Sequence, residues 1–142
     1  SLRMRIRQVD TSDDDVLERL TIMHKLTFFS HAPVYDFNVG WWWIATHGKE
    51  DAGFCGMHYS KRRKAIYLCR AGVVQRFQGQ GLHIRMIRVR ERAARRMKQK
   101  MLVTDTNNNI RSANNLIRCG FTMFEPETPW GLGGATYWRK EL

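Results

Sequence analysis

The feature that most constrains the fold is a pair of glycines between an apolar run and a long basic segment. The run ends at Val73-Val74, and the hexapeptide Gln78-Gly79-Gln80-Gly81-Leu82-His83 follows it. Glycine adopts dihedrals that other residues resist and lets the main chain approach a ligand closely. The first N–H groups of a helix have no partner inside it, and the helix dipole adds positive potential there. The sequence therefore predicts a strand, a tight turn and a helix whose start binds phosphate or pyrophosphate.

Apolar periodicity along the rest of the chain predicts a mixed α/β fold with one central sheet. Alternating or continuous apolar runs predict strands at residues 5–9, 41–46, 52–59, 65–74, 101–104, 121–124 and 135–139. Helical spacing predicts helices over residues 13–27, 82–98 and 107–118, while residues 30–40 form an irregular segment or a short helix. Because no repeat, linker or composition break interrupts this order, we expect residues 1–142 to form one domain.

The helix after the glycines has two distinct faces. The apolar stripe, which we expect to face the core, consists of Leu82, Met86, Val89, Ala93 and Met97. The neighbouring face, which we expect to be exposed, carries Arg85, Arg88, Arg92, Arg95 and Arg96. With a net charge of +11, the chain favours polyanionic partners: nucleic acid, an acidic protein or a phosphorylated cofactor. A solvated, solubilising helix face is the other interpretation, and no base-reading motif accompanies the arginines.

The cysteines and the hydropathy of the sequence indicate the compartment in which we expect the protein. Cys55, Cys69 and Cys119 are odd in number and widely spaced, which matches neither a disulfide framework nor a zinc site, so we expect no metal and a reducing, cytoplasmic environment. The sequence contains no apolar run near the ~18 residues of a membrane helix and no signal peptide, so we expect no membrane partner.

Two motifs, about 30 residues apart with a predicted strand between them, resemble those of the GNAT superfamily of acyl-CoA-dependent N-acyltransferases. The first is a Gln or Arg, two residues, a Gly, one residue and a Gly or Ala; here Gln78, Gly81 and His83 occupy these positions. The resemblance covers nearly the whole chain by element order. It implies a central, mostly antiparallel sheet of about six to seven strands flanked by about four helices.

The second motif is the family's Asn-x-x-Ala-x-x-x-Tyr-x-x-x-Gly-Phe pattern. It matches Asn109, Ser112, Leu116 and Gly120-Phe121. The resemblance implies an N-acetyltransferase that transfers acetyl from acetyl-CoA to an amine of a small molecule or protein by direct attack. The residues that it places around the cofactor are Val73, Val74, Gln78, Gly79, Gln80, Gly81, Leu82, His83, Ile84, Asn109 and Ser112.

Within that set the resemblance implies distinct roles. Backbone amides of residues 79–84 hold the pyrophosphate, and Val73 and Val74 pair with the pantetheine arm like an added strand. Asn109 and Ser112 face the pantetheine or its thiol end. Arg76, or an arginine of the basic helix, meets the phosphates of the adenosine end.

Three positions depart from the family pattern. His83 replaces a small residue; it contacts phosphate or is a partly buried helix histidine. Tyr67 stands where some members carry a glutamate base, and a phenol titrating near ~10 is a poor base, so Tyr67 orients substrate or water or is a structural tyrosine. Leu116 stands where many carry a tyrosine acid, and leucine cannot donate a proton.

His58, on the neighbouring predicted strand, is the second candidate for the general base, because histidines ordinarily titrate in the right range. An exposed strand histidine without a catalytic role is the other interpretation. The catalytic candidates are Tyr67 and His58.

A second hypothesis follows from these departures. A catalytically weak or inactive protein of the same fold would bind and modulate another protein through its basic, Trp-rich surface. Trp41-Trp42-Trp43 belong either to the core or to a substrate or subunit surface, such as that of a homodimer. We expect acceptor specificity to lie in residues 30–40 and 128–134, both of which are irregular.

Overall fold

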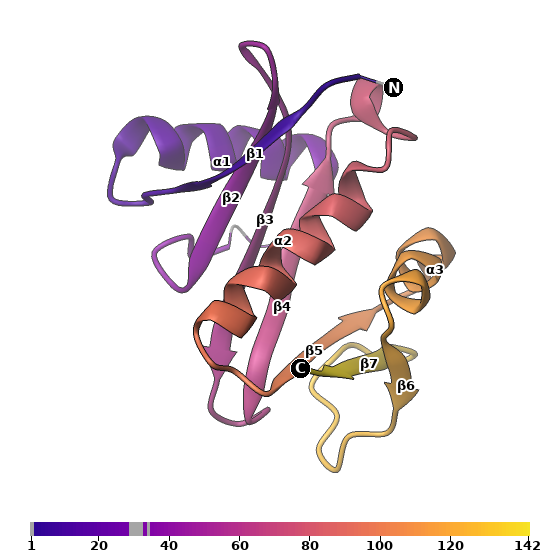
Figure 1. Ribbon diagram of the computed structural model, residues 1–142. Helices are drawn as coiled ribbons and strands as arrows, with labels where there is room; N and C mark the ends of the chain where they lie inside the picture. Colours follow the sequence, from indigo (N-terminus) through magenta and orange to yellow (C-terminus); the bar gives the residue numbers. More distant parts are fainter. Residues whose placement is uncertain (1, 29–32, 34) are drawn as a thin grey trace.

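The structure, a computed structural model, describes residues 2–28, 33 and 35–142 (Figure 1). The elements in chain order are β1 (Arg5–Val9), α1 (Asp14–Thr27), β2 (Trp41–His47), β3 (Glu50–Ser60), β4 (Ala65–Val73), a 3₁₀ helix η1 (Gln75–Phe77), α2 (Leu82–Arg96), β5 (Met101–Thr106), α3 (Ile110–Arg118), β6 (Thr122–Phe124) and β7 (Thr136–Glu141). All predicted strands form. Among the described residues there are three α-helices instead of about four, because residues 35–40 are turns and coil and most of 29–34 lies outside the described residues.

The seven strands form one sheet in the order β1-β2-β3-β4-β5-β7-β6. Every neighbouring pair is antiparallel except β4 and β5, which run parallel. The parallel ladder is short, since it contains only Ile66 opposite Leu102 and Tyr67 opposite Val103. Beyond these pairs the two strands diverge, and the sheet opens in its middle (Figure 1). The predicted mixed fold with a mostly antiparallel sheet is confirmed.

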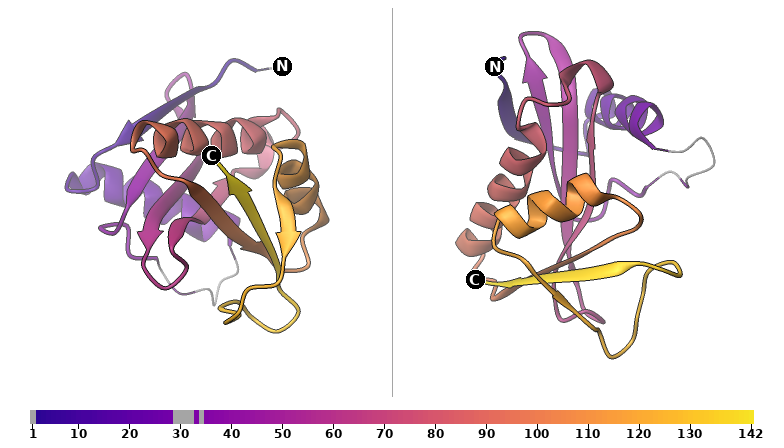
Figure 2. Two further views of the ribbon diagram at one scale, coloured as in Figure 1. Left: turned by 60° about the horizontal axis from the view of Figure 1, so that its bottom comes forward. Right: turned by 90° about the vertical axis from the view of Figure 1, so that its right-hand side faces the viewer.

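Helices α1 and α2 cover opposite faces of the first half of the sheet, as the right-hand view of Figure 2 shows. Under α1, Leu20 and Met23 pack in a cluster with Trp42 and Phe54. Under α2, a larger cluster contains Trp43 and the apolar side of the helix. Because strand side chains alternate between faces, adjacent tryptophans enter different clusters. Trp42 and Trp43 are 0% and 2% exposed, so the core interpretation is correct for these two and they form no surface patch. Trp41 is partly buried against the cluster that contains Trp43.

The two predicted faces of α2 are confirmed. Leu82, Met86 and Ala93 are buried and Val89 and Met97 partly so, whereas all five arginines of the second face are exposed. Arg90 is an exception that the pattern did not indicate, because it is only 3% exposed. Among the described residues, no helix has both the length and the apolar character needed to cross a bilayer.

Candidate functional site

The predicted glycine turn forms ahead of α2. Gly79 and Gly81 have φ of +78° and +76°, in the left-handed region that favours glycine. Gly81 is the N-cap of α2 and offers no side chain to the first turn. The first helical bond joins the Arg85 N–H to the Gly81 carbonyl, so the N–H groups ahead of Arg85 have no acceptor inside the helix. A Cβ at either glycine would meet nothing within 4 Å. The turn is therefore bare main chain facing open space.

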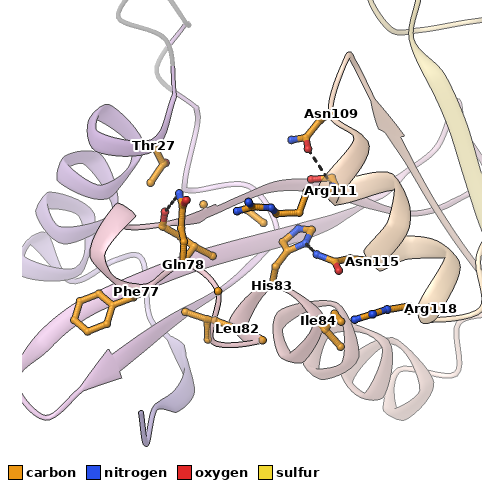
Figure 3. A pocket seen from close by; sticks show the side chains of 16 residues that line it. Thr27, Phe77, Gln78, Leu82, His83, Ile84, Asn109, Arg111, Asn115 and Arg118 are labelled. Carbon is orange, nitrogen blue, oxygen red and sulfur yellow. Dashed lines mark hydrogen bonds between the residues drawn. The ribbon is translucent and has the colours of Figure 1, made fainter. Parts of the chain in front are cut away.

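A cavity of about 520 Å³ lies against this turn (Figure 3). Nine of the predicted cofactor residues line it: Val73, Gln78, Gly79, Gly81, Leu82, His83, Ile84, Asn109 and Ser112. Val74 and Gln80 do not. The Val74 N–H donates to the Ala52 carbonyl, on the β3 side of the chain, and the Gln80 Oε1 accepts from the Leu2 N–H.

Polar side chains near the cavity make contacts that the sequence analysis did not indicate. Arg76 forms an ion pair with Glu50 at 2.6 Å and does not line the cavity, while Arg111 and Arg118 of α3 do. The Asn109 Oδ1 accepts from the Ser112 N–H at 3.0 Å, so Asn109 is also the N-cap of α3. A contact of Arg76, or of an arginine of α2, with the adenosine phosphates stays a prediction. The arginines that line this cavity in the described residues come from α3.

A second cavity, of about 610 Å³, lies where β4 and β5 diverge. The two cavities share Thr27, Ala71, His83, Asn109 and Ser112. The rest of the second wall comes from the end of α1, from β4, β5, α2 and α3, and from the loop between β5 and α3. These residues are Leu26, Phe28, Leu68, Cys69, Arg70, Ile87, Arg90, Thr104, Asp105, Thr106, Asn107, Asn108 and Leu116. Because five residues border both cavities, the two cavities are neighbouring compartments of one cleft. Its ends are the glycine turn and the gap in the sheet.

A bulge interrupts β4 at the second cavity. Leu68 pairs with Met57 and Arg70 with Gly56, so Cys69 between them has no partner on β3. A bulge leaves the extra residue outside the ladder and bends its strand. Beyond Tyr67, β4 also has no paired residue on the β5 side. Main-chain groups of β4 at the bulge are therefore available to the cavity.

The His83 side chain extends from the first turn of α2 toward Asn115 of α3 (Figure 3). His83 borders both cavities. The Asn115 Nδ2 lies 3.0 Å from the His83 Nδ1; because the amide nitrogen can only donate, Nδ1 is the acceptor and Nε2 carries the proton. Burial, with a smaller effect of the Arg90 charge, lowers the pKa of His83 to about 4. At neutral pH His83 is therefore an uncharged donor.

The structure connects the candidate Tyr67 to a residue that the sequence analysis missed. The Tyr67 hydroxyl donates to the Asp105 Oδ1 at 2.6 Å, and the Trp130 Nε1 donates to the same oxygen at 2.9 Å. The Arg63 guanidinium stacks on the Tyr67 ring at 3.8 Å. Burial, followed by the Asp105 charge, raises the pKa of Tyr67 above its usual value, so the phenol is a hydrogen-bond donor. Asp105 lines the second cavity and Tyr67 does not.

The other catalytic candidate, His58, lies on β3 and borders neither cavity. Its Nε2 is 3.2 Å from the Tyr35 hydroxyl, and its ring meets Tyr67 edge-on at 5.6 Å between centroids. A role for His58 as base stays a prediction. Asp105 is the only carboxylate that lines either cavity in the described part of the chain.

All three cysteines are free, with Cys55 and Cys119 buried. Within residues 2–28, 33 and 35–142, no group of three His, Cys, Asp or Glu side chains could hold a metal ion.

Comparison with known proteins shows the fold. No family model matches the chain, and no curated protein matches its sequence. Among solved structures, an IAA acetyltransferase from Bacillus cereus ATCC 14579 is 17% identical, with a TM-score of 0.75 over 99% of this chain and 100% of that one. A Bacillus subtilis acetyltransferase in complex with CoA is 14% identical (TM-score 0.71, 99% of each chain). A GNAT family acetyltransferase from Listeria monocytogenes 4b F2365 is 19% identical (TM-score 0.69, 99% of this chain and 96% of that one). The chain has the GNAT fold, as the motifs predicted.

Proposed function

We propose that this chain, with its GNAT fold, is an N-acetyltransferase that transfers an acetyl group from acetyl-CoA to an amine. The observation that carries the proposal is the bare glycine turn, which faces a cleft running to the gap between β4 and β5. The pyrophosphate of the cofactor needs main-chain donors at one end of the cleft, and its thioester needs an enclosed reaction site at the other end. The solved structure of the B. subtilis acetyltransferase with CoA supports this choice of ligand.

The residues present fit coenzyme A. The open space in front of Gly79 and Gly81 leaves room for the pyrophosphate, which the free N–H groups of α2 would hold. The Nε2 of His83 would add a neutral donor, and Arg111 and Arg118 would supply positive charge from α3. Val73 and Ala71 line the cavity on the unpaired side of β4, where main-chain groups would pair with the pantetheine amides.

The gap in the sheet would hold the reacting groups. The amine nitrogen forms a bond to the thioester carbon, the C–S bond breaks, and the amine proton passes finally to the departing sulfur. Main-chain N–H groups at the Cys69 bulge would donate to the carbonyl oxygen as charge builds on it. Asp105 would hold the amine and accept its proton, directly or through a water, because no other carboxylate lines the cleft in the described residues.

Tyr67 and Trp130 would position the Asp105 carboxylate by donating to its Oδ1, which leaves Oδ2 for the acceptor. Leu116 is buried in the wall of the second cavity and donates nothing. The thiolate would therefore take its proton from Asp105 or from solvent. Holding two reactants in place lowers a barrier by roughly 7–11 kcal/mol in favourable cases, so an enzyme without a dedicated acid still accelerates the reaction.

The absence of a tyrosine at Leu116 also favours a second candidate function, a weak or inactive member of the fold that modulates an acidic partner. Its basic surface is present, since Arg85, Arg88 and Arg92 of α2 are exposed. Turnover separates the two functions. Release of free CoA with any amine supports the enzyme, whereas CoA binding with no thiol release from a broad amine panel supports the modulator.

The cofactor site is tested by placing a negative charge in the turn. Gly81→Asp should abolish the rise in melting temperature that CoA gives the wild type, because the carboxylate repels the pyrophosphate. Gly134→Asp is the matched control, since Gly134 also has a positive φ, of +85°, a Cβ there also meets nothing within 4 Å, and Gly134 borders neither cavity. A wild type that CoA does not stabilise, or a Gly81→Asp variant that CoA stabilises equally, contradicts the proposal.

A further inference from the structure

We infer that the acceptor amine carries an anionic group, a carboxylate or a phosphate, and that Arg70 binds it in the second cavity. This inference rests on the proposed function, because it assigns the acceptor for the same cleft. Arg70 lies beside the bulge, and its side chain is half-buried where β4 faces the cavity. Arg70 is not among the residues predicted to contact the cofactor, and its side chain has no role in the chemistry described above.

The groups that contact the Arg70 guanidinium carry no negative charge. Its Nη1 lies 2.8 Å from the Nε2 of His24. Its guanidinium lies over the rings of Phe28, at 4.8 Å, and Tyr35, at 5.1 Å. Burial, followed by the charge of Arg70, lowers the pKa of His24, so this histidine is neutral and its Nε2 accepts. The contacts orient the guanidinium without neutralising it.

No carboxylate balances this charge within the chain. The ion pairs among the described residues involve Arg19, Arg76, Arg95 and Lys140. The residues outside the described part are Ser1, Phe29, Ser30, His31, Ala32 and Val34, none of which is acidic. A guanidinium offers five N–H donors in a planar fork that fits carboxylate or phosphate. An oriented, unbalanced guanidinium in a cavity wall is a site for such an anion.

Arg90 increases the positive potential of the same cavity. It is 3% exposed and donates to the carbonyls of Met86, at 3.0 Å, and Gly56, at 3.1 Å, which are neutral acceptors. The cavity wall thus holds two arginines and one carboxylate, Asp105. An acceptor with an ammonium for Asp105 and an anion for Arg70 matches this arrangement, whereas a plain alkylamine leaves the partly buried Arg70 cation without an anion.

Matched amines test the inference. The probes are the twenty amino acids with their carboxamides, and aminoethyl phosphate with ethanolamine. Binding is measured by isothermal titration calorimetry on protein saturated with CoA, in the wild type and in each variant. In the wild type, the Arg70 Nε–Hε resonance, which the Arg70→Gln spectrum assigns, shows whether the anion contacts this guanidinium. Charge-assisted hydrogen bonds predict that at least one acid binds about 10- to 100-fold more tightly than its amide. The carboxylate and phosphate arms identify which anion is preferred.

Three variants make the test specific. Arg70→Gln should remove the preference for the anion, Arg70→Lys should retain part of it, and Arg85→Gln, which removes one charge from the exposed face of α2, should leave it unchanged. If amides bind as tightly as acids, if no anionic probe binds, or if Arg85→Gln acts like Arg70→Gln, the inference is wrong. CoA binding is measured separately by thermal shift. If the protein binds CoA but shows no preference for anionic amines, only the acceptor assignment is wrong. If the protein does not bind CoA, the proposed function is wrong and this inference with it.

Discussion

His83 illustrates how a single residue near the α2 turn links the cleft to stability. Its folded-state pKa is lowered to about 4 by burial, against about 6.5 in an unfolded chain. Between pH 6.5 and pH 4 the His83 ring therefore binds a proton in the unfolded state but not in the folded state. The stabilisation from the neutral ring is present above pH 6.5 and is lost as the pH falls through about 4.

We predict that the free energy of unfolding decreases between pH 6.5 and pH 4, and that His83→Gln makes this decrease smaller. The contribution of His83 is at most about 3 kcal/mol, less to the extent that its ring faces the cavity. Urea unfolding at several pH values measures it. His24, whose pKa burial also lowers, keeps a residual slope in the variant. Parallel curves for the two proteins would show that His83 does not titrate in this way.

A substitution at Gly56 tests how tightly the side chains pack on the face of the sheet that α1 covers. A Cβ at Gly56 would lie 2.6 Å from the Cδ2 of Trp42, whose side chain is fully buried. We predict that Gly56→Ala lowers the free energy of unfolding by about 1–3 kcal/mol, as overpacking does in closed cores. Gly133→Ala is the control, because a Cβ there has open space. Equal denaturation midpoints for the two variants would mean that Trp42 moves aside at no cost.

At the scale of elements, α3 depends on the side chain of Asn109 at its start. The Asn109 Oδ1 caps the helix through the Ser112 N–H, and the same two residues border both cavities. We predict that Asn109→Ala costs about 1 kcal/mol of stability, whereas Asn109→Asp, which keeps the accepting oxygen, costs much less. Thermal denaturation compares them. If both variants lose the same stability, the amide acts through contacts other than the cap.

The elements also explain which parts of the site the sequence could predict. The glycine turn and the α2 faces depend on residues close together in the chain, so periodicity and glycine chemistry indicated them correctly. The bulge at Cys69 depends on the register between β3 and β4, and the gap depends on how far β4 pairs with β5. Because these are long-range pairings, Arg70 and Asp105 could not be assigned to one cavity, and the helical pattern assigned Arg90 to neither face of α2.

At the scale of the molecule, the sheet consists of two halves joined by a narrow connection. One half contains β1–β4 with α1 and α2, and the other contains β5–β7 with α3 (Figures 1 and 2). Between the central strands the ladder has two residue pairs, and the Thr104 hydroxyl adds a bond to the Leu68 carbonyl at 2.8 Å. Lys140 of β7 joins the halves again through Glu91 of α2, at 2.8 Å. A ligand in the cleft would contact both halves.

We therefore predict that CoA stabilises the junction more than the rest of the fold. At 100 times its dissociation constant a ligand adds about 2.7 kcal/mol to the free energy of unfolding. Amide hydrogen exchange should slow most in residues 79–84 and in α3, where the walls of the first cavity meet. Exchange in the β1–β2 ladder, which borders neither of the two cavities, is the internal control for local opening. Slowing of locally exchanging amides that is confined to α2 would mean that the ligand does not bridge the two halves, because only a group held from both sides protects α3 and the turn together.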